Sequence, residues 1–190
     1  MQRRWIFPTA ARDVSAKRLC RELGIPDFLG WVLTRNGLEE PSAAGAFLHP
    51  KLKDLSEPFQ LPGMDRAAGR VREALAGREQ IVLYGDYDVD GVSSLALLHR
   101  LLTAMGGRVQ CFLPHRSGEG YGLSAAGVAR CFAEHAPDLL LAVDCGTNSL
   151  REVAEIQARG ADVVILDHHE PAAELPRCTA LVNPKTGPDF

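Results

Sequence analysis

The sequence predicts an α/β protein, in which a parallel sheet has helices on both faces and follows a small, mostly helical N-terminal region. From residue 79 onward, short runs rich in Val, Ile and Leu alternate with longer segments of helical periodicity. Strands that are apolar along their whole length are typical of parallel sheets buried on both faces. Residues 1–78 lack this alternation. We therefore expect two regions, 1–78 and 79–190.

Three helices are expected in the first region. One covers 27–33 and ends near Asn36-Gly37, because glycine and asparagine adopt the left-handed conformation that closes a helix. A second begins at Ser42, a favourable N-cap residue, and stops before Pro50. The third covers 64–76, where apolar residues recur on one helical face.

The second region alternates strands with helices. The expected strands cover 81–84, 109–113, 139–143, 163–166 and 179–182. The expected helices cover 93–105, 124–135 and 148–159. In open parallel sheets, ligands bind beyond the carboxyl ends of the strands. Any functional site is therefore expected at that edge.

Three of these strand ends carry acidic or imidazole side chains. The residues concerned are Asp86, Asp88 and Asp90 after the first strand, Asp144 after the third, and Asp167-His168-His169 after the fourth. Carboxylates gathered at one edge repel one another unless a cation holds them. Imidazole favours transition metals and carboxylates favour harder cations, so the mixture indicates Mn²⁺ or Mg²⁺ ahead of Zn²⁺ or iron. Taken singly, Asp144 could be a helix cap or a surface acid, and the histidines could be hydrogen-bonded loop residues.

The segment Asp86-x-Asp88-x-Asp90-Gly91 also matches the opening of an EF-hand calcium loop. That loop requires a glutamate at its twelfth position, which is Leu97 in this sequence. It also follows a helix, whereas a strand is expected before Asp86. We therefore reject the EF-hand interpretation.

Composition sets only broad limits. Of the 190 residues, 46% are hydrophobic and 24% are charged, which is ordinary for a soluble globular protein. No apolar run approaches the roughly 20 residues of a membrane span, and the five cysteines form no Cys-x-x-Cys pair. We therefore expect a cytoplasmic protein. The net charge of −3 does not argue against a phosphate substrate, because the acids of the candidate site would be neutralised by cations.

Several motifs resemble one known family. Gly85-Asp-Tyr-Asp-Val-Asp-Gly91, Val143-Asp-Cys-Gly146 and Asp167-His-His169 are similar to the first three motifs of the DHH phosphoesterase superfamily. Other segments resemble its bacterial branch of single-stranded-DNA-specific 5′→3′ exonucleases. They are Ala46-Phe-Leu-His-Pro50, Leu55-Ser-Glu-Pro-Phe59, Leu61-Pro-Gly-Met-Asp65, Pro114-His-Arg116, Glu119-Gly-Tyr-Gly-Leu-Ser124 and Leu181-Val-Asn-Pro-Lys185. The resemblance begins near Leu29 and implies a Rossmann-like DHH domain.

The resemblance also implies roles for individual residues. The metal ligands would be Asp88, Asp90, Asp144 and His168, with Asp144 bridging two ions. Asp86 and His169 would act in catalysis: Asp86 beside the metals, and His169 facing the scissile phosphate or completing the site. Arg116 would contact phosphate, although a salt bridge within its loop is an alternative. Tyr121 could stack on a base or pack under its loop, and Cys145 is expected to be a buried thiol.

The implied activity is two-metal hydrolysis of single-stranded DNA in repair and recombination. Single-stranded-DNA-binding protein and a repair helicase would be further partners. Members of this family have another metal-binding aspartate and further domains beyond the DHH motif, and this sequence ends at Phe190 before them. We therefore expect a DHH domain incomplete at its C-terminus, weakly active or inactive alone. A phosphoesterase of short oligonucleotides and a non-catalytic repair or replication scaffold are the alternatives.

Overall fold

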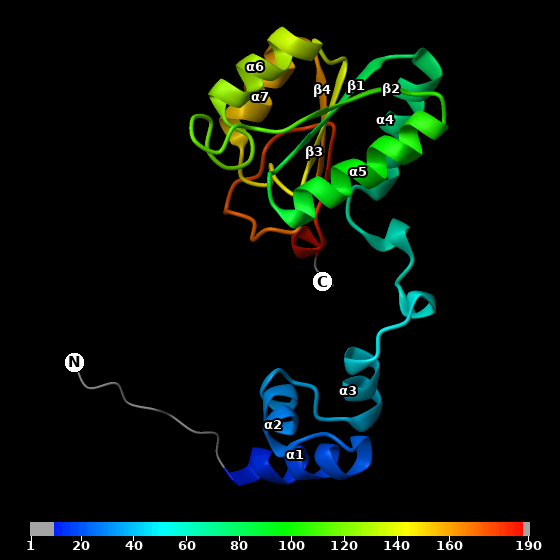
Figure 1. The fold of residues 1–190 in the computed structure, drawn as a ribbon, viewed down its shortest axis with the longest axis vertical. Coiled ribbons are helices and arrows are strands. Elements are labelled where there is room, and N and C mark those ends of the chain that lie inside the picture. The colour runs from blue at the N-terminus through cyan, green and yellow to red at the C-terminus, as the bar shows by residue number, and fades with distance from the viewer. Residues whose placement is uncertain (1–9, 188–190) are drawn as a thin grey trace, which may run out of the picture. The chain divides into compact units, whose positions relative to one another are not determined.

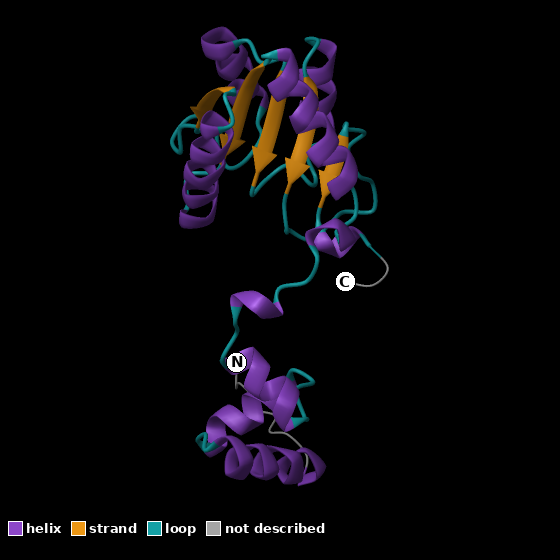
Figure 2. Ribbon diagram, turned by 90° about the vertical axis from the view of Figure 1, so that its right-hand side faces the viewer, coloured by secondary structure: helices purple, strands orange, loops and turns teal. Residues whose placement is uncertain are grey.

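A computed structural model describes residues 10–187. The chain forms two compact units, one extending to Ser56 and the other beginning at Glu57. Figures 1 and 2 show the elements of each unit. No helix in the described range is long and apolar enough to cross a membrane. Its five cysteines are all free thiols.

The first unit contains three helices: α1 (Ala10–Leu23), α2 (Asp27–Arg35) and α3 (Pro41–Leu48), with a single 3₁₀ turn after them (Leu52–Asp54). Their shared core is small, and its fully buried members are Leu19, Leu33 and Ala44. Helix α2 packs closely on α1, since a Cβ added to Gly30 would lie 2.8 Å from the carbonyl oxygen of Ala16. Helix α1 was not predicted from the sequence.

The second unit is built on a five-stranded sheet. Its strands are β1 (Gln80–Gly85), β2 (Arg108–Phe112), β3 (Leu139–Val143), β4 (Asp162–Leu166) and β5 (Ala180–Val182). They lie in the order β2-β1-β3-β4-β5 and all pair in parallel. Strand β3 is buried along its whole length, as a sheet covered on both faces requires. The predicted fold class is therefore confirmed.

Helices cover both faces of this sheet (Figure 1). On one face, α4 (Met64–Gly77) and α5 (Val89–Ala104) pack with strand residues such as Leu83 and Leu141. On the other, α6 (Ala125–His135) and α7 (Leu150–Ala158) pack with residues such as Val82 and Ile165. Short 3₁₀ turns precede α4 (Pro58–Gln60) and follow β5 (Pro184–Thr186).

Helix α4 accounts for a difference from the expected domain boundary. The sequence suggested regions 1–78 and 79–190, whereas the compact units divide between Ser56 and Glu57. Ala67 and Ala74 of α4 are buried in the same core as the sheet. Arg70 of α4 also donates a 2.6 Å hydrogen bond to Asp162 at the start of β4. The helix therefore belongs to the sheet; residues 1–9 and 188–190 of the expected regions lie outside the described part.

Candidate metal centre

The candidate site lies at the carboxyl ends of β1, β3 and β4. In this strand order, the chain leaves β1 toward β2 on one side, while β3 lies on its other side. The connections after β1 and β3 therefore diverge, and such a switch point leaves a crevice at the edge of the sheet. A cavity of about 540 Å³ opens there, with Asp90, Asp144, Asp167 and His168 among its lining residues. All three predicted strand ends thus meet at one site.

The end of β1 is shaped by the turn into α5. Asp88 is the N-cap of α5, and its Oδ1 accepts a 3.0 Å hydrogen bond from the backbone N–H of Gly91. This bond lowers the pKa of Asp88. Gly91 lies directly against Asp86, because an added Cβ would be 2.7 Å from the Asp86 backbone nitrogen. Asp86 itself is fully buried, whereas Asp90 is exposed on the first turn of α5.

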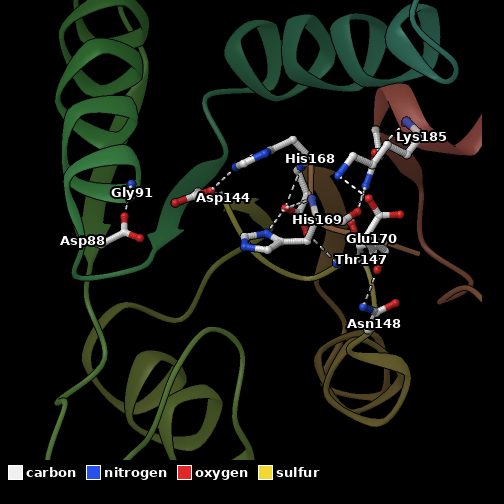
Figure 3. A network of polar contacts seen from close by, with 11 residues as sticks. Asp88, Gly91, Asp144, Thr147, Asn148, His168, His169, Glu170 and Lys185 are labelled. Atoms are coloured by element: carbon white, nitrogen blue, oxygen red, sulfur yellow. Dashed lines mark hydrogen bonds and ion pairs between the residues drawn. The ribbon is translucent and has the colours of Figure 1, made fainter. Parts of the chain in front are cut away.

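Asp144 follows β3 in an unusual backbone conformation. Its φ is +60°, in the left-handed region that few residues other than glycine adopt, and its N–H donates a 2.9 Å bond to the carbonyl of Leu166. Asp144 Oδ1 lies 3.0 Å from His168 Nε2. Burial raises the pKa of Asp144, the contact with His168 opposes this rise, and the charge of Asp88 adds to it. Figure 3 shows the carboxylates of Asp88 and Asp144 next to one another.

Asp167, after β4, organises the two histidines that follow it. Its Oδ1 accepts bonds from the backbone N–H of His168 (2.7 Å) and from His169 Nδ1 (2.7 Å). Its Oδ2 accepts a 2.9 Å bond from the N–H of Thr147. Burial alone would raise the pKa of Asp167, but the hydrogen bonds from Thr147 and His169 lower it to about 2. The same contact with Asp167 raises the pKa of His169.

These contacts produce a cluster suited to a cation. Asp144, His168 and His169 each offer one ligand atom, and the three atoms lie within 4.8 Å of one another. Asp86 Oδ2 and Asp144 Oδ2 are buried and, among the described residues, have no hydrogen-bond partner. An unpaired buried carboxylate oxygen is costly unless a proton or a metal satisfies it. The donor set therefore fits a divalent cation.

The loop between β2 and α6 borders this cluster. Arg116 is exposed, forms no ion pair with any described residue, and has its guanidinium carbon 5.2 Å from the centroid of the Tyr87 ring. The Tyr121 ring meets Tyr87 and His169 edge to face, at centroid distances of 5.9 and 6.2 Å. Burial and the nearby charge of Asp86 raise the pKa of Tyr121. Among residues 10–187, Arg116 therefore lacks the salt bridge that was the alternative to a phosphate contact, and Tyr121 is half exposed beside the site.

An ion pair that the sequence did not reveal holds this loop. Glu119 accepts hydrogen bonds from Arg130 Nε (2.6 Å) and Nη2 (2.9 Å) on α6, and from the N–H of His115 (2.7 Å). Arg130 also donates to the carbonyl of Leu113 at 2.7 Å. The loop that includes Arg116 and Tyr121 is therefore bound to α6 through Leu113 and Glu119.

Comparison with known proteins agrees with the geometry. Residues 80–189 match the family model described as DHH family, N-terminal domain. The chain belongs to the DHH family. It is 36% identical over 182 residues to the single-stranded-DNA-specific exonuclease RecJ of Bacillus subtilis, which covers 96% of this chain and 23% of the relative.

Solved structures of DHH proteins show the same similarity. A crystal structure of exonuclease RecJ bound to manganese matches with a TM-score of 0.65 and 38% identity, covering 72% of this chain and 34% of that one. RecJ of Thermus thermophilus in complex with Mn²⁺ matches with a TM-score of 0.65 and 29% identity, covering 96% and 24%. This DHH chain spans about a quarter of the length of the curated relatives it matches.

Two residues that shape the site, Asp167 and Asn183, had no role assigned to them from the sequence. Asp167 was recognised as an acid at a strand end, but its part in holding His169 was not predicted. Asn183, at the carboxyl end of β5, was named only within a resembling segment, although it is fully buried beside His169. A signal was available, since Asn183 follows a short apolar strand as Asp144 and Asp167 do. Cys145 is buried as expected, and burial raises the pKa of its thiol.

Proposed function

We propose that this chain supplies the metal-binding part of a 5′→3′ exonuclease that hydrolyses phosphodiester bonds of single-stranded DNA. Two divalent cations, Mn²⁺ or Mg²⁺, would be bound. The observation that carries the proposal is the meeting of Asp144, His168 and His169, with two unpaired buried carboxylate oxygens close by. Five carboxylates (Asp86, Asp88, Asp90, Asp144 and Asp167) and two imidazoles at one edge of a parallel sheet suit this chemistry better than any cofactor site.

Each site residue has a proposed part. The ligands would be Asp88, Asp90, Asp144 and His168, and Asp144 would bridge the two cations. Asp88 can use Oδ2 for this purpose, because its Oδ1 caps α5. Asp90 borders the same cavity as Asp144 and His168. Asp86, with one buried unpaired oxygen, would lie beside the cations and add negative charge to their site.

The remaining residues would act on the DNA. Bound divalent cations would supply the charge that activates water for in-line attack and stabilises the leaving oxygen. His169 keeps Nδ1 on Asp167, which leaves Nε2 to donate a hydrogen bond to the scissile phosphate. The raised pKa of His169 favours its protonated form, which suits an anionic partner. Arg116 would bind a phosphate, and the exposed face of Tyr121 would stack on a base.

The similarity to RecJ also supports proposals about the cellular setting. We place this function in DNA repair and recombination, in the cytoplasm. Single-stranded-DNA-binding protein would present the substrate, and a repair helicase would generate it. The relatives are named only as single-stranded-DNA-specific exonucleases, and the chain spans about a quarter of their length. The cellular setting and the two protein partners are therefore carried over from the family resemblance.

A metal titration tests the site directly. We expect Mn²⁺ to bind to the chain in a calorimetric titration, and Asp144→Asn to weaken binding about 10-fold or more, since a bridging ligand would be lost. Ser149→Ala, at the start of α7 and outside the ligand cluster, serves as the matched control. A chain that folds but binds neither Mn²⁺ nor Mg²⁺ would contradict the proposal and favour a non-catalytic scaffold.

An exchange of segments tests the substrate. This chain would replace the matching segment of Bacillus subtilis RecJ. We expect the chimaera, with Mn²⁺, to release mononucleotides from a long 5′-phosphorylated single strand faster than it cleaves a dinucleotide. Asp144→Asn in the same chimaera should abolish release. Preference for the dinucleotide would instead favour a phosphoesterase of short oligonucleotides.

A further inference from the structure

Asn183 uses its whole side-chain amide within the site. It lies at the carboxyl end of β5 and is fully buried. Its Nδ2 donates to Thr147 Oγ1 (2.9 Å) and to the backbone carbonyl of His169 (2.9 Å). Its Oδ1 accepts a 2.9 Å bond from the N–H of Lys185. Both N–H donors of the amide thus bind the two loops that border the candidate metal centre, one carrying Thr147 and the other His169.

These bonds close a ring around His169. Thr147, held by Asn183 at its hydroxyl, donates its backbone N–H to Asp167 Oδ2 at 2.9 Å. Asp167 Oδ1 in turn lies 2.7 Å from His169 Nδ1 and accepts the His169 N–H at 3.2 Å. The circuit therefore runs from the His169 carbonyl through Asn183, Thr147 and Asp167 back to the His169 ring. Figure 3 shows Thr147 close to the loop with His169.

A second asparagine lies nearby but does not belong to the ring. Asn148 donates to the carbonyl of Glu170 (2.9 Å) and accepts from the N–H of Ala172 (2.8 Å). It therefore holds the same loop a little further along, without contacting His169. This makes Asn148 a matched control for Asn183.

We propose that Asn183 is a positioning residue that, through Thr147 and Asp167, fixes the His169 ring with Nδ1 on Asp167 and Nε2 available to the phosphate. The proposal rests on the nuclease function proposed above, because it is that function which gives His169 a phosphate to face. Partners behind a functional histidine select its tautomer and orientation. Asn183 does not contact the side chains of the Asp167–His169 pair. It instead binds the two loops that carry Thr147 and His169, and so holds the pair in place. It touches neither DNA nor cation.

The decisive measurement is the tautomer of His169 in the metal-free chain, read from long-range ¹H–¹⁵N correlations at an alkaline pH where the ring is neutral. We expect one tautomer in the unmodified chain, with the proton on Nδ1. In Asn183→Ala two acceptors lose their donor, and we expect a mixture of tautomers. Asn148→Ala should keep the single tautomer. Thr147→Val removes the hydroxyl that accepts from Asn183, so it should give the same mixture as Asn183→Ala. Thr147→Ser keeps that hydroxyl and should keep the single tautomer.

Asn183→Asp provides a second test if the alanine variant does not fold. It keeps the shape and the acceptor for Lys185 but loses both donors, so the same mixture is expected. A folded variant, Asn183→Ala or Asn183→Asp, that retains the single Nδ1 tautomer would overturn the proposal. A general loss of stability without a change of tautomer would also overturn it, because Asn183 would then be only structural.

Kinetics of the RecJ chimaera give an independent readout. We expect Asn183→Ala to lower kcat about 10- to 100-fold and to leave KM for the strand unchanged, since orientation matters most in the transition state. An equal fall in kcat for Asn148→Ala would count against a specific role. The tautomer measurement needs neither metal nor DNA. It can therefore succeed even if the proposed nuclease function fails, which separates the two questions.

Discussion

Replacing Glu119 by glutamine should loosen the loop that borders the site. Glu119 receives two hydrogen bonds from the Arg130 guanidinium and one from the His115 N–H. Its side chain is 10% exposed, so solvent replaces these bonds poorly. Glutamine keeps the shape but turns one acceptor oxygen into a donor that faces other donors. Arg116 and Tyr121 would then lose the anchor of their loop.

The magnitude follows from the electrostatics of the pair. The hydrogen bond and charge of Arg130 lower the pKa of Glu119 from its usual value near 4.5 to about 2. At roughly 1.4 kcal/mol per pH unit this shift corresponds to about 3 kcal/mol, and screening near the surface reduces it to about 2 kcal/mol. Because the folded-state pKa is the lower one, this stabilisation is complete above about pH 4.5. It disappears as the pH falls toward about 2.

Urea unfolding followed by circular dichroism measures this effect. At neutral pH, Glu119→Gln should lower the free energy of unfolding by about 2 kcal/mol, and the difference should shrink as the pH is lowered. Glu134→Gln is the control, because Glu134 pairs with the same Arg130 at 3.0 Å but is 45% exposed. Its effect should stay below about 0.5 kcal/mol. Equal losses for the two variants, or a loss independent of pH, would refute the reasoning.

Two further predictions concern the site itself. Asp144→Asn should raise the free energy of unfolding of the metal-free chain, because burial and the charge of Asp88 disfavour the ionised form of Asp144 and the contact with His168 only partly opposes them. Thermal unfolding without metal measures this gain, and a destabilised variant would contradict it. Gly91→Ala should cost about 1–3 kcal/mol in urea unfolding, because the new methyl group would collide with the backbone of Asp86. Gly69→Ala is its control, since an added Cβ there meets nothing within 4 Å; equal costs would refute the collision.

The strands were predictable because their apolar runs are uninterrupted. The predicted strand 139–143 coincides with β3, and the other four strands lie within about one residue of their observed ends. Helix starts were less predictable where a side chain caps the helix. Helix α5 begins at Val89, four positions before the expected start, because Asp88 caps it. Helix α1 was missed because its polar sequence gave a weak periodic signal.

The sequence predicted which residues of the site follow a strand, but not the hydrogen bonds that hold them. The convergence of Asp86, Asp144 and His168 followed from the rule that strand ends share one edge in a parallel sheet. The hydrogen-bond partners did not follow, because they depend on which strands are neighbours. Asn183 reaches His169 only because β5 pairs with β4. The anchoring of the Arg116 loop by Glu119 likewise depends on where α6 packs.

The strand order has a consequence for the timing of folding. Strand β1 pairs with both β2 and β3, and the acidic and imidazole side chains of the candidate metal centre follow β1, β3 and β4. Contacts between segments so distant in sequence form late, because closing the intervening chain loses entropy first. The carboxylates would therefore meet only after most of the sheet has assembled. A bound cation should then slow unfolding and leave the folding rate almost unchanged.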